Sequence, residues 1–102
     1  MKSQEFIDAA TESTGLSDFG DDALFGGDGW RTGLDVLVDS IDREARLHEM
    51  GEMVVQGELT QYLVNRLRIV DHHRSHPDIR ERDIAPPIVI MGQARTGTTM
   101  LF

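Results

Sequence analysis

The chain has 102 residues, of which 39% are hydrophobic and 27% charged, a composition typical of a small globular domain. Its net charge of −8 disfavours binding to nucleic acids and to anionic membranes, because both are themselves negatively charged. The absence of cysteine excludes a disulfide framework and thiol chemistry.

The sequence carries no signal-peptide pattern and no apolar span of about 20 residues. We therefore expect a cytoplasmic protein without a membrane span. It has no internal repeats and no low-complexity tract.

Residues 1–29 are predicted to form a short helix followed by a loop rich in glycine and aspartate. Ser3 is expected to cap the helix, and Gly15 to end it. The apolar positions of this helix are Phe6, Ile7 and Ala10. The loop of residues 15–29 lacks the ligand spacing and the closing glutamate of an EF-hand, so we interpret it as a solvated linker.

Two longer helices are predicted in the middle of the chain. From about Trp30 to His48, apolar residues recur at intervals of three and four, which indicates an amphipathic helix. These positions are Leu34, Leu37, Val38, Ile41, Ala45 and His48. A second helical region runs from about Glu49 to His76, and Gly57 is either a break in it or a close packing contact. Its expected buried face consists of Met53, Val54, Tyr62, Leu63, Leu67 and Val70.

A histidine cluster stands at the end of the second helical region. His72 and His76 are four residues apart, so they share a helix face and could ligate a transition metal. Arg74 lies within the cluster, and no cysteine near it completes a metal shell. We interpret the cluster as a polar helix end and expect no metal.

An apolar run precedes a glycine-containing loop near the end of the chain. Residues 88–91 show no alternation of polar and apolar side chains, which predicts a strand covered on both faces, as in a parallel sheet. Gly92 and Gly97 then frame a G-x-x-x-x-G-T-T loop that opens a helix. Glycines here permit positive φ angles and let successive backbone N–H groups point at one anion.

The side chains of this loop are suited to bind phosphate or sulfate. Thr98 and Thr99 offer hydroxyl donors, and Arg95 offers a bidentate, permanently charged guanidinium. Arg95 would therefore neutralise charge on a leaving phosphate rather than give it a proton. The glycine spacing matches a P-loop, but Thr98 occupies the position of the P-loop lysine.

The strand, the sequence Arg-Thr-Gly-Thr-Thr and the helix start resemble the 5′-phosphosulfate loop of the sulfotransferases. Roughly residues 15–102 are similar to the amino-terminal part of a bacterial branch of that family, in which a helical leader precedes the strand. The stretches similar to this leader are Phe25–Leu47, Leu63–Arg68 and His76–Ile79. Ala94 departs from a frequent proline, and Arg95 from a frequent lysine.

The resemblance implies a donor and a set of residues that bind it. The donor would be 3′-phosphoadenosine 5′-phosphosulfate, used without a metal. The residues expected to hold its phosphosulfate are Arg95, Thr96, Gly97, Thr98 and Thr99. Among them, Arg95 would also be catalytic. The sulfuryl group would pass to a hydroxyl or amine of a small molecule, lipid or sugar.

The resemblance also implies a fold. The parent enzyme would be α/β and P-loop-like with a parallel sheet, and this chain would be a mostly helical piece of it with one terminal β-strand. Its divisions would be an acidic helix and loop in 1–29, a helical leader in 30–77, and a linker, first strand and phosphate loop in 78–102. No second segment of this chain is predicted to form a strand that could pair with the first. In the family, the residues that bind the 3′-phosphate and the base that activates the acceptor lie mostly after this loop. We therefore expect an amino-terminal fragment that is inactive alone.

Other interpretations of the chain are open. The loop could belong to a kinase-like or other nucleotide-binding protein with a degenerate P-loop. Alternatively, the helices could form an interaction module, able to oligomerise, with a relic loop. Trp30, Met50, Met53 and Tyr62 are expected to pack in the core, although Leu59, Tyr62 and Arg66 share a helix face and could line an acceptor pocket.

Overall fold

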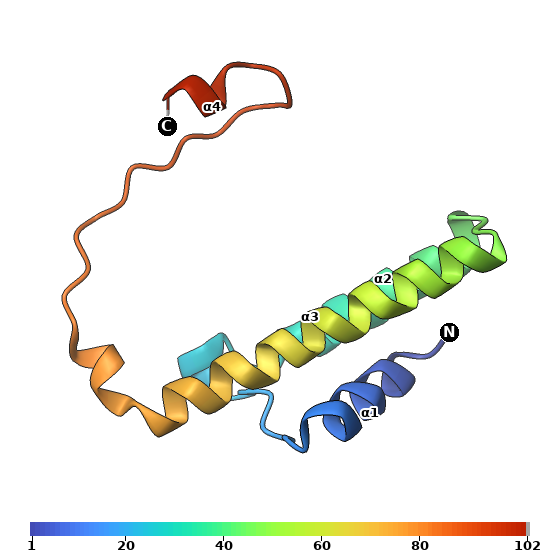
Figure 1. Ribbon diagram of the computed structural model, residues 1–102, viewed down its shortest axis with the longest axis horizontal. Coiled ribbons are helices and arrows are strands. Elements are labelled where there is room, and N and C mark those ends of the chain that lie inside the picture. The colour runs from blue at the N-terminus through green and yellow to red at the C-terminus, as the bar shows by residue number, and fades with distance from the viewer. Residues whose placement is uncertain (102) are drawn as a thin grey trace.

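The computed structural model describes residues 1–101, and helices dominate it (Figure 1). Phe102, the last residue of the predicted segment 78–102, lies outside the described residues. The helices are α1 (Ser3–Thr14), α2 (Gly29–Glu44), α3 (Glu49–Ser75) and the short α4 (Thr98–Leu101). Two 3-10 helices, η1 (Ala23–Phe25) and η2 (Pro77–Glu81), lie between them.

Helix α1 confirms the first predicted helix. Phe6 and Ala10, one helical turn apart, are buried on the face that packs against α3. Gly15 ends the helix with a φ of 70°, and its N–H donates to the carbonyl of Thr11 at 2.8 Å. The predicted cap is wrong, since Ser3 is the first helical residue and no side-chain cap hydrogen bond is present.

Helix α2 is amphipathic as predicted but ends at Glu44 rather than near His48. Arg46 adopts a φ of 48°, which is incompatible with a right-handed helix. Leu34 and Val38 are buried, whereas Leu37 is exposed. The inward-facing stripe of α2 is therefore narrower than the sequence pattern indicates.

Helix α3 runs unbroken through Gly57. No atom lies within 4 Å of a Cβ placed on Gly57, so this residue is neither a break nor a close packing contact. The long helix tolerates it at a cost of about 1 kcal/mol relative to alanine. No helix among residues 1–101 is long and apolar enough to cross a membrane.

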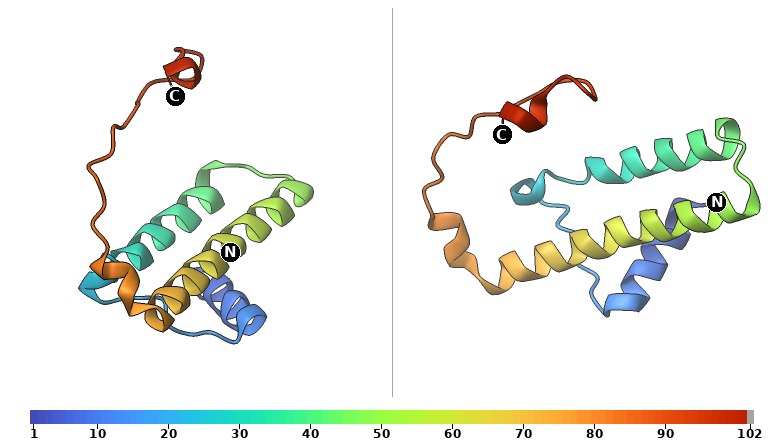
Figure 2. Two further views of the ribbon diagram at one scale, coloured as in Figure 1. Left: turned by 60° about the vertical axis from the view of Figure 1, so that its left-hand side comes forward. Right: turned by 45° about the horizontal axis from the view of Figure 1, so that its top comes forward.

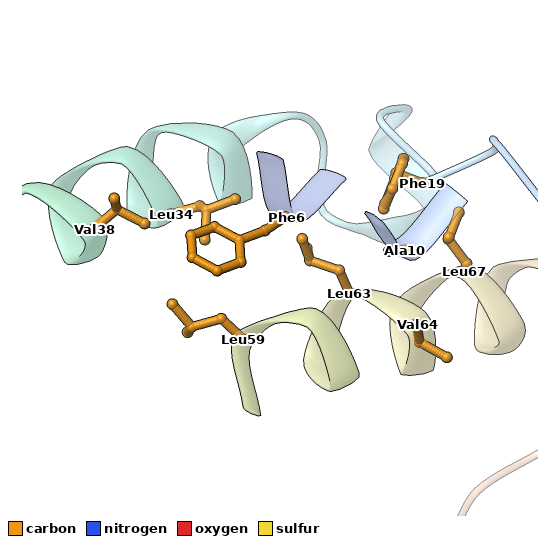
Figure 3. Close-up of a cluster of buried hydrophobic side chains, with 9 residues drawn as sticks. All are labelled: Phe6, Ala10, Phe19, Leu34, Val38, Leu59, Leu63, Val64 and Leu67. Atoms are coloured by element: carbon orange, nitrogen blue, oxygen red, sulfur yellow. The ribbon is translucent and has the colours of Figure 1, made fainter. Parts of the chain in front are cut away.

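The core lies where α1 meets α2 and α3, and Figure 3 shows Phe6 between the side chains of the two longer helices. Its buried residues are Phe6, Ala10, Phe19, Leu34, Val38, Leu59, Leu63, Val64 and Leu67. Helix α1 spans about 18 Å and α3 about 40 Å, so α1 covers only part of α3. The two views of Figure 2 show the far end of the α2–α3 hairpin extending past α1.

This difference in length explains why Met50 and Met53 near the start of α3 are exposed, whereas Tyr62, next to the buried Leu63, is exposed on another face of the covered part of α3. Leu63, Leu67 and Val70 are buried as predicted. Four residues expected in the core are exposed or lie outside the packed region of α3, and for them the prediction is wrong: Met50, Met53, Val54 and Tyr62. Trp30 is partly buried and packs against the core.

The loop of residues 15–29 is a packed element and not the solvated linker predicted. Phe19 is buried and stacks on Trp30 with ring centroids 5.0 Å apart. Asp18 and Asp22 both pair with Arg74 near the end of α3. Their carboxylates thus join the loop to α3 rather than facing solvent alone.

The acidic side chains of this loop predict a loss of stability in acid. The pKa of Asp18 lies below its ordinary value of 3.8, chiefly because the N–H of Gly20 donates to it and secondly because of Arg74. The pKa of Asp21 is also lowered, mainly by the indole N–H of Trp30. Such carboxylates stabilise the fold above their unfolded pKa and lose that contribution as pH falls through the folded value.

We therefore expect the urea midpoint to fall as the pH is lowered below about 4. Asp18→Asn should flatten this dependence, because the substituted side chain does not titrate. Urea titrations followed by circular dichroism over a pH series measure both effects. Glu12→Gln, on the exposed side of α1, is the control, and a decline in acid that is equally steep in wild type and Asp18→Asn contradicts the prediction.

This chain is mostly helical as predicted, but the predicted terminal β-strand is wrong, and residues 1–101 contain no part of the parallel sheet expected of the parent enzyme. The described part of the chain contains helices but no strand and no sheet. Residues 83–93 leave the helices as an extended segment, and a turn at residues 94–97 connects it to α4 (Figure 1). Ile88 is 94% exposed and Met91 84%. A strand requires a neighbour for its backbone N–H and C=O groups, and residues 83–96 make no backbone–backbone hydrogen bond.

Candidate functional site

The loop from Gly92 to Thr99 folds into a tight turn followed by the first turn of α4. Arg95 and Gly97 both have positive φ angles, of 67° and 88°. This conformation is ordinary for glycine but unfavourable for arginine, so Arg95 is held in a strained backbone geometry. The N–H of Met100 donates to the carbonyl of Gly97 at 3.1 Å, which closes the helical turn.

Gly92 is required by a close approach within the same loop. A Cβ at this position would lie 2.6 Å from the hydroxyl oxygen of Thr96 and 2.9 Å from the Cγ2 of Thr98. The Thr96 hydroxyl donates to the carbonyl of Gln93 at 2.6 Å, so it ties the loop together. The two glycines thus have different roles, a steric one at Gly92 and a conformational one at Gly97.

Four of the five predicted donor-binding residues line one hollow of about 340 Å³. They are Arg95, Gly97, Thr98 and Thr99, and Met100 completes the lining. Thr96 does not line it, because its side chain turns back over Gly92. Among residues 1–101, no carboxylate side chain lines the hollow and none forms a salt bridge with Arg95. The local chemistry is therefore cationic and rich in hydrogen-bond donors.

The chain matches no family model, no curated protein and no solved structure. The resemblance to sulfotransferases consequently rests on the residues of the loop and of the helical stretches before it. The function has to be argued from the chemistry of these residues.

The histidine cluster at the end of α3 shows local packing. The rings of His72 and His76 stack with centroids 4.4 Å apart, and Nδ1 of His76 donates to the carbonyl of His72 at 3.0 Å. The same carbonyl also accepts the backbone N–H of His76 at 3.0 Å, so the imidazole supplies a second donor at the end of the helix. Across the described chain, no group of three or more His, Cys, Asp or Glu side chains is arranged to hold a metal ion.

A second hollow, of about 270 Å³, lies on the side of α3. Its lining residues are Phe25, Tyr62, Asn65, Arg66, Ile69 and Val70. The sequence had placed Tyr62 and Arg66 with Leu59 on an acceptor-binding face, but Leu59 is buried in the core and does not take part. The spacing of three and four residues along a helix could also have predicted Asn65 and Ile69 on the face that carries Tyr62 and Arg66. Phe25 could not be found this way, because it comes from the folded loop.

Proposed function

We propose that the loop of residues 92–99 binds the 5′-phosphosulfate of 3′-phosphoadenosine 5′-phosphosulfate, and that this chain is the donor-binding part of a sulfotransferase. The observation that carries this proposal is the hollow lined jointly by Arg95, Gly97, Thr98 and Thr99. A fixed cation, two hydroxyls and glycine backbone around one cavity are suited to a multiply charged oxyanion. No Asp or Glu of residues 1–101 lines the hollow, so no acidic side chain of the described residues would repel such a ligand.

The proposed roles follow from the charge changes in sulfuryl transfer. An acceptor oxygen or nitrogen attacks sulfur, the bond between sulfur and the bridging oxygen breaks, and negative charge grows on the departing phosphate. Arg95 would neutralise that charge, and the hydroxyls of Thr98 and Thr99 would donate to phosphate or sulfate oxygens. The acceptor's proton needs a base, and no His, Asp or Glu lines this hollow. We therefore expect the 102-residue chain to bind donor without transferring the sulfuryl group.

Calorimetric titration with adenosine 3′,5′-bisphosphate tests this proposal. Arg95→Ala should weaken binding by roughly ten- to a hundredfold, because a charge-assisted hydrogen bond contributes about 1.5–3 kcal/mol. Arg68→Ala is the matched control, since Arg68 is an exposed arginine of α3 that does not line the loop hollow. The control should bind as the unsubstituted chain does.

Two outcomes would count against the proposal. Equal affinity in Arg95→Ala and in the unsubstituted chain would show that the loop does not bind the ligand. Magnesium-dependent ATP binding stronger than that of the bisphosphate would instead favour a nucleotide-binding protein with a degenerate P-loop. Sulfotransferase activity of the 102-residue chain above an Arg95→Ala control would contradict the expected lack of turnover.

A further inference from the structure

The hollow on the side of α3 combines an apolar lining with a cation. Tyr62, Asn65, Arg66 and Ile69 follow one another at helical spacing, so they form a stripe along one face of α3. Phe25, from η1 in the folded loop, forms a further part of the lining. None of the residues of the 92–99 loop lines this hollow, so it is a separate site from the one proposed above.

Arg66 is held rigidly but its charge is not neutralised. Its Nε donates to the carbonyl of Phe19 at 2.7 Å, and its Nη2 donates to those of Gly20 and Phe25 at 3.2 and 3.3 Å. These acceptors are neutral, and no carboxylate of residues 1–101 forms a salt bridge with Arg66. Its Nη1 group makes no hydrogen bond within the same residues, so a positioned donor is left available.

Asp21, an acidic group that interacts electrostatically with Arg66, is already engaged by other partners. Asp21 accepts hydrogen bonds from the indole of Trp30 at 2.8 Å and from Arg31 at 2.9 and 3.0 Å. These contacts use both of its carboxylate oxygens. An external anion therefore does not have to displace an internal salt bridge in order to reach Arg66.

Asn65 supplies a second donor beside Arg66. The side-chain amide of Gln61 donates to Oδ1 of Asn65 at 2.9 Å, which fixes the oxygen of Asn65 as an acceptor. The Nδ2 group of Asn65 has no acceptor among the described residues. Two residues that line the hollow, Asn65 and Arg66, thus each carry a donor group without an acceptor among the described residues.

The rest of the lining is aromatic and aliphatic, and two further guanidinium groups lie close to it. Val70 is 1% exposed and closes the inner side of the hollow. The Phe25 ring is also contacted by the guanidinium groups of Arg74 and Arg80, at 5.0 and 5.6 Å from its centroid. Arg80 forms no salt bridge in the described part of the chain. Arg74 is paired with Asp18 and Asp22, so Arg66 and Arg80 are the guanidinium groups beside this hollow that form no salt bridge among residues 1–101.

We propose that this hollow binds a small aryl carboxylate. The ring of the ligand packs among Phe25, Tyr62 and Ile69, where aromatic side chains favour an aromatic partner. The carboxylate accepts hydrogen bonds from Nη1 of Arg66 and Nδ2 of Asn65. A hollow of about 270 Å³ is of a size suited to a small molecule.

The test uses the full 102-residue chain and naphthalene-2-carboxylate as probe, with affinity measured by calorimetry. The neutral analogue 2-naphthamide should bind at least about tenfold more weakly, since it has the ring but not the charge. Tyr62→Ala and Asn65→Ala should each weaken binding of the carboxylate several-fold. Both side chains are exposed, so these variants should keep the fold, which circular dichroism checks.

Met53→Ala is the control variant, because Met53 is an exposed residue of the same helix outside the hollow. It should leave the affinity unchanged. The proposal is overturned if the carboxylate and the amide bind equally, if neither binds at millimolar concentration, or if binding responds to Met53→Ala but not to Tyr62→Ala.

Discussion

Replacing Leu67 with alanine should lower the free energy of unfolding by about 3 kcal/mol. Leu67 is fully buried and belongs to the core that α1 and α3 share with Phe19 (Figure 3). Removing its branched end leaves a cavity lined by side chains from three segments, which cannot all move to fill it. Urea unfolding followed by helical circular dichroism measures the change.

Met53→Ala provides the comparison on the same helix. Met53 is 69% exposed, so its truncation should change the free energy of unfolding by less than about 0.5 kcal/mol. Similar values for the two variants would mean that α1 does not pack on α3 as described. The contrast tests the placement of the core and not merely the helicity of α3.

Arg66→Ala should lower the free energy of unfolding by about 2 kcal/mol or more. It removes the donor from the carbonyls of Phe19, Gly20 and Phe25, and a buried acceptor left without a partner costs about 1–3 kcal/mol. It also removes the guanidinium that lies 5.2 Å from the centroid of the Trp30 ring. Arg66→Lys should recover little of the loss, because an ammonium group cannot reproduce the planar fork.

The Arg66→Ala substitution should change the fluorescence of a nearby residue as well as the free energy of unfolding. Trp30 is the only tryptophan, and it stacks on Phe19, so its fluorescence reports directly on the folded loop. Arg66→Ala should shift this emission to longer wavelength as the loop opens to water. Arg68→Ala, two residues further along α3, should leave it unchanged. An unaltered spectrum and urea midpoint in Arg66→Ala would contradict the bridging role of Arg66.

The helices were largely predictable from local patterns. Spacings of three and four place Phe6 with Ala10 and Leu34 with Val38, and both pairs are buried. Gly15 ends α1 because it can adopt a positive φ. Residues such as Met53 were misplaced because periodicity reports a face of a helix and not how far along that face a neighbour extends.

The candidate site was predictable to a similar extent. The spacing of Gly92 and Gly97 identified the loop, and the structure gathers Arg95, Thr98 and Thr99 around one hollow. The role of Thr96 could not be predicted from the sequence, because its hydroxyl donates to a backbone carbonyl of the loop itself. A threonine hydroxyl can form hydrogen bonds with several nearby backbone groups or with a ligand, and which bond forms depends on the folded geometry.

The sequence by itself determined the helical segments, the acidic charge and the chemistry of the 92–99 loop, because each depends on residues close together in the chain. Only the tertiary structure decided that Arg66 holds the acidic loop against α3 and that Phe25 lines a hollow with Tyr62. It also decided that the apolar run at residues 88–91 forms no strand among the described residues. Pairing and burial require a partner from elsewhere in the fold, and local sequence carries no information about whether that partner is present.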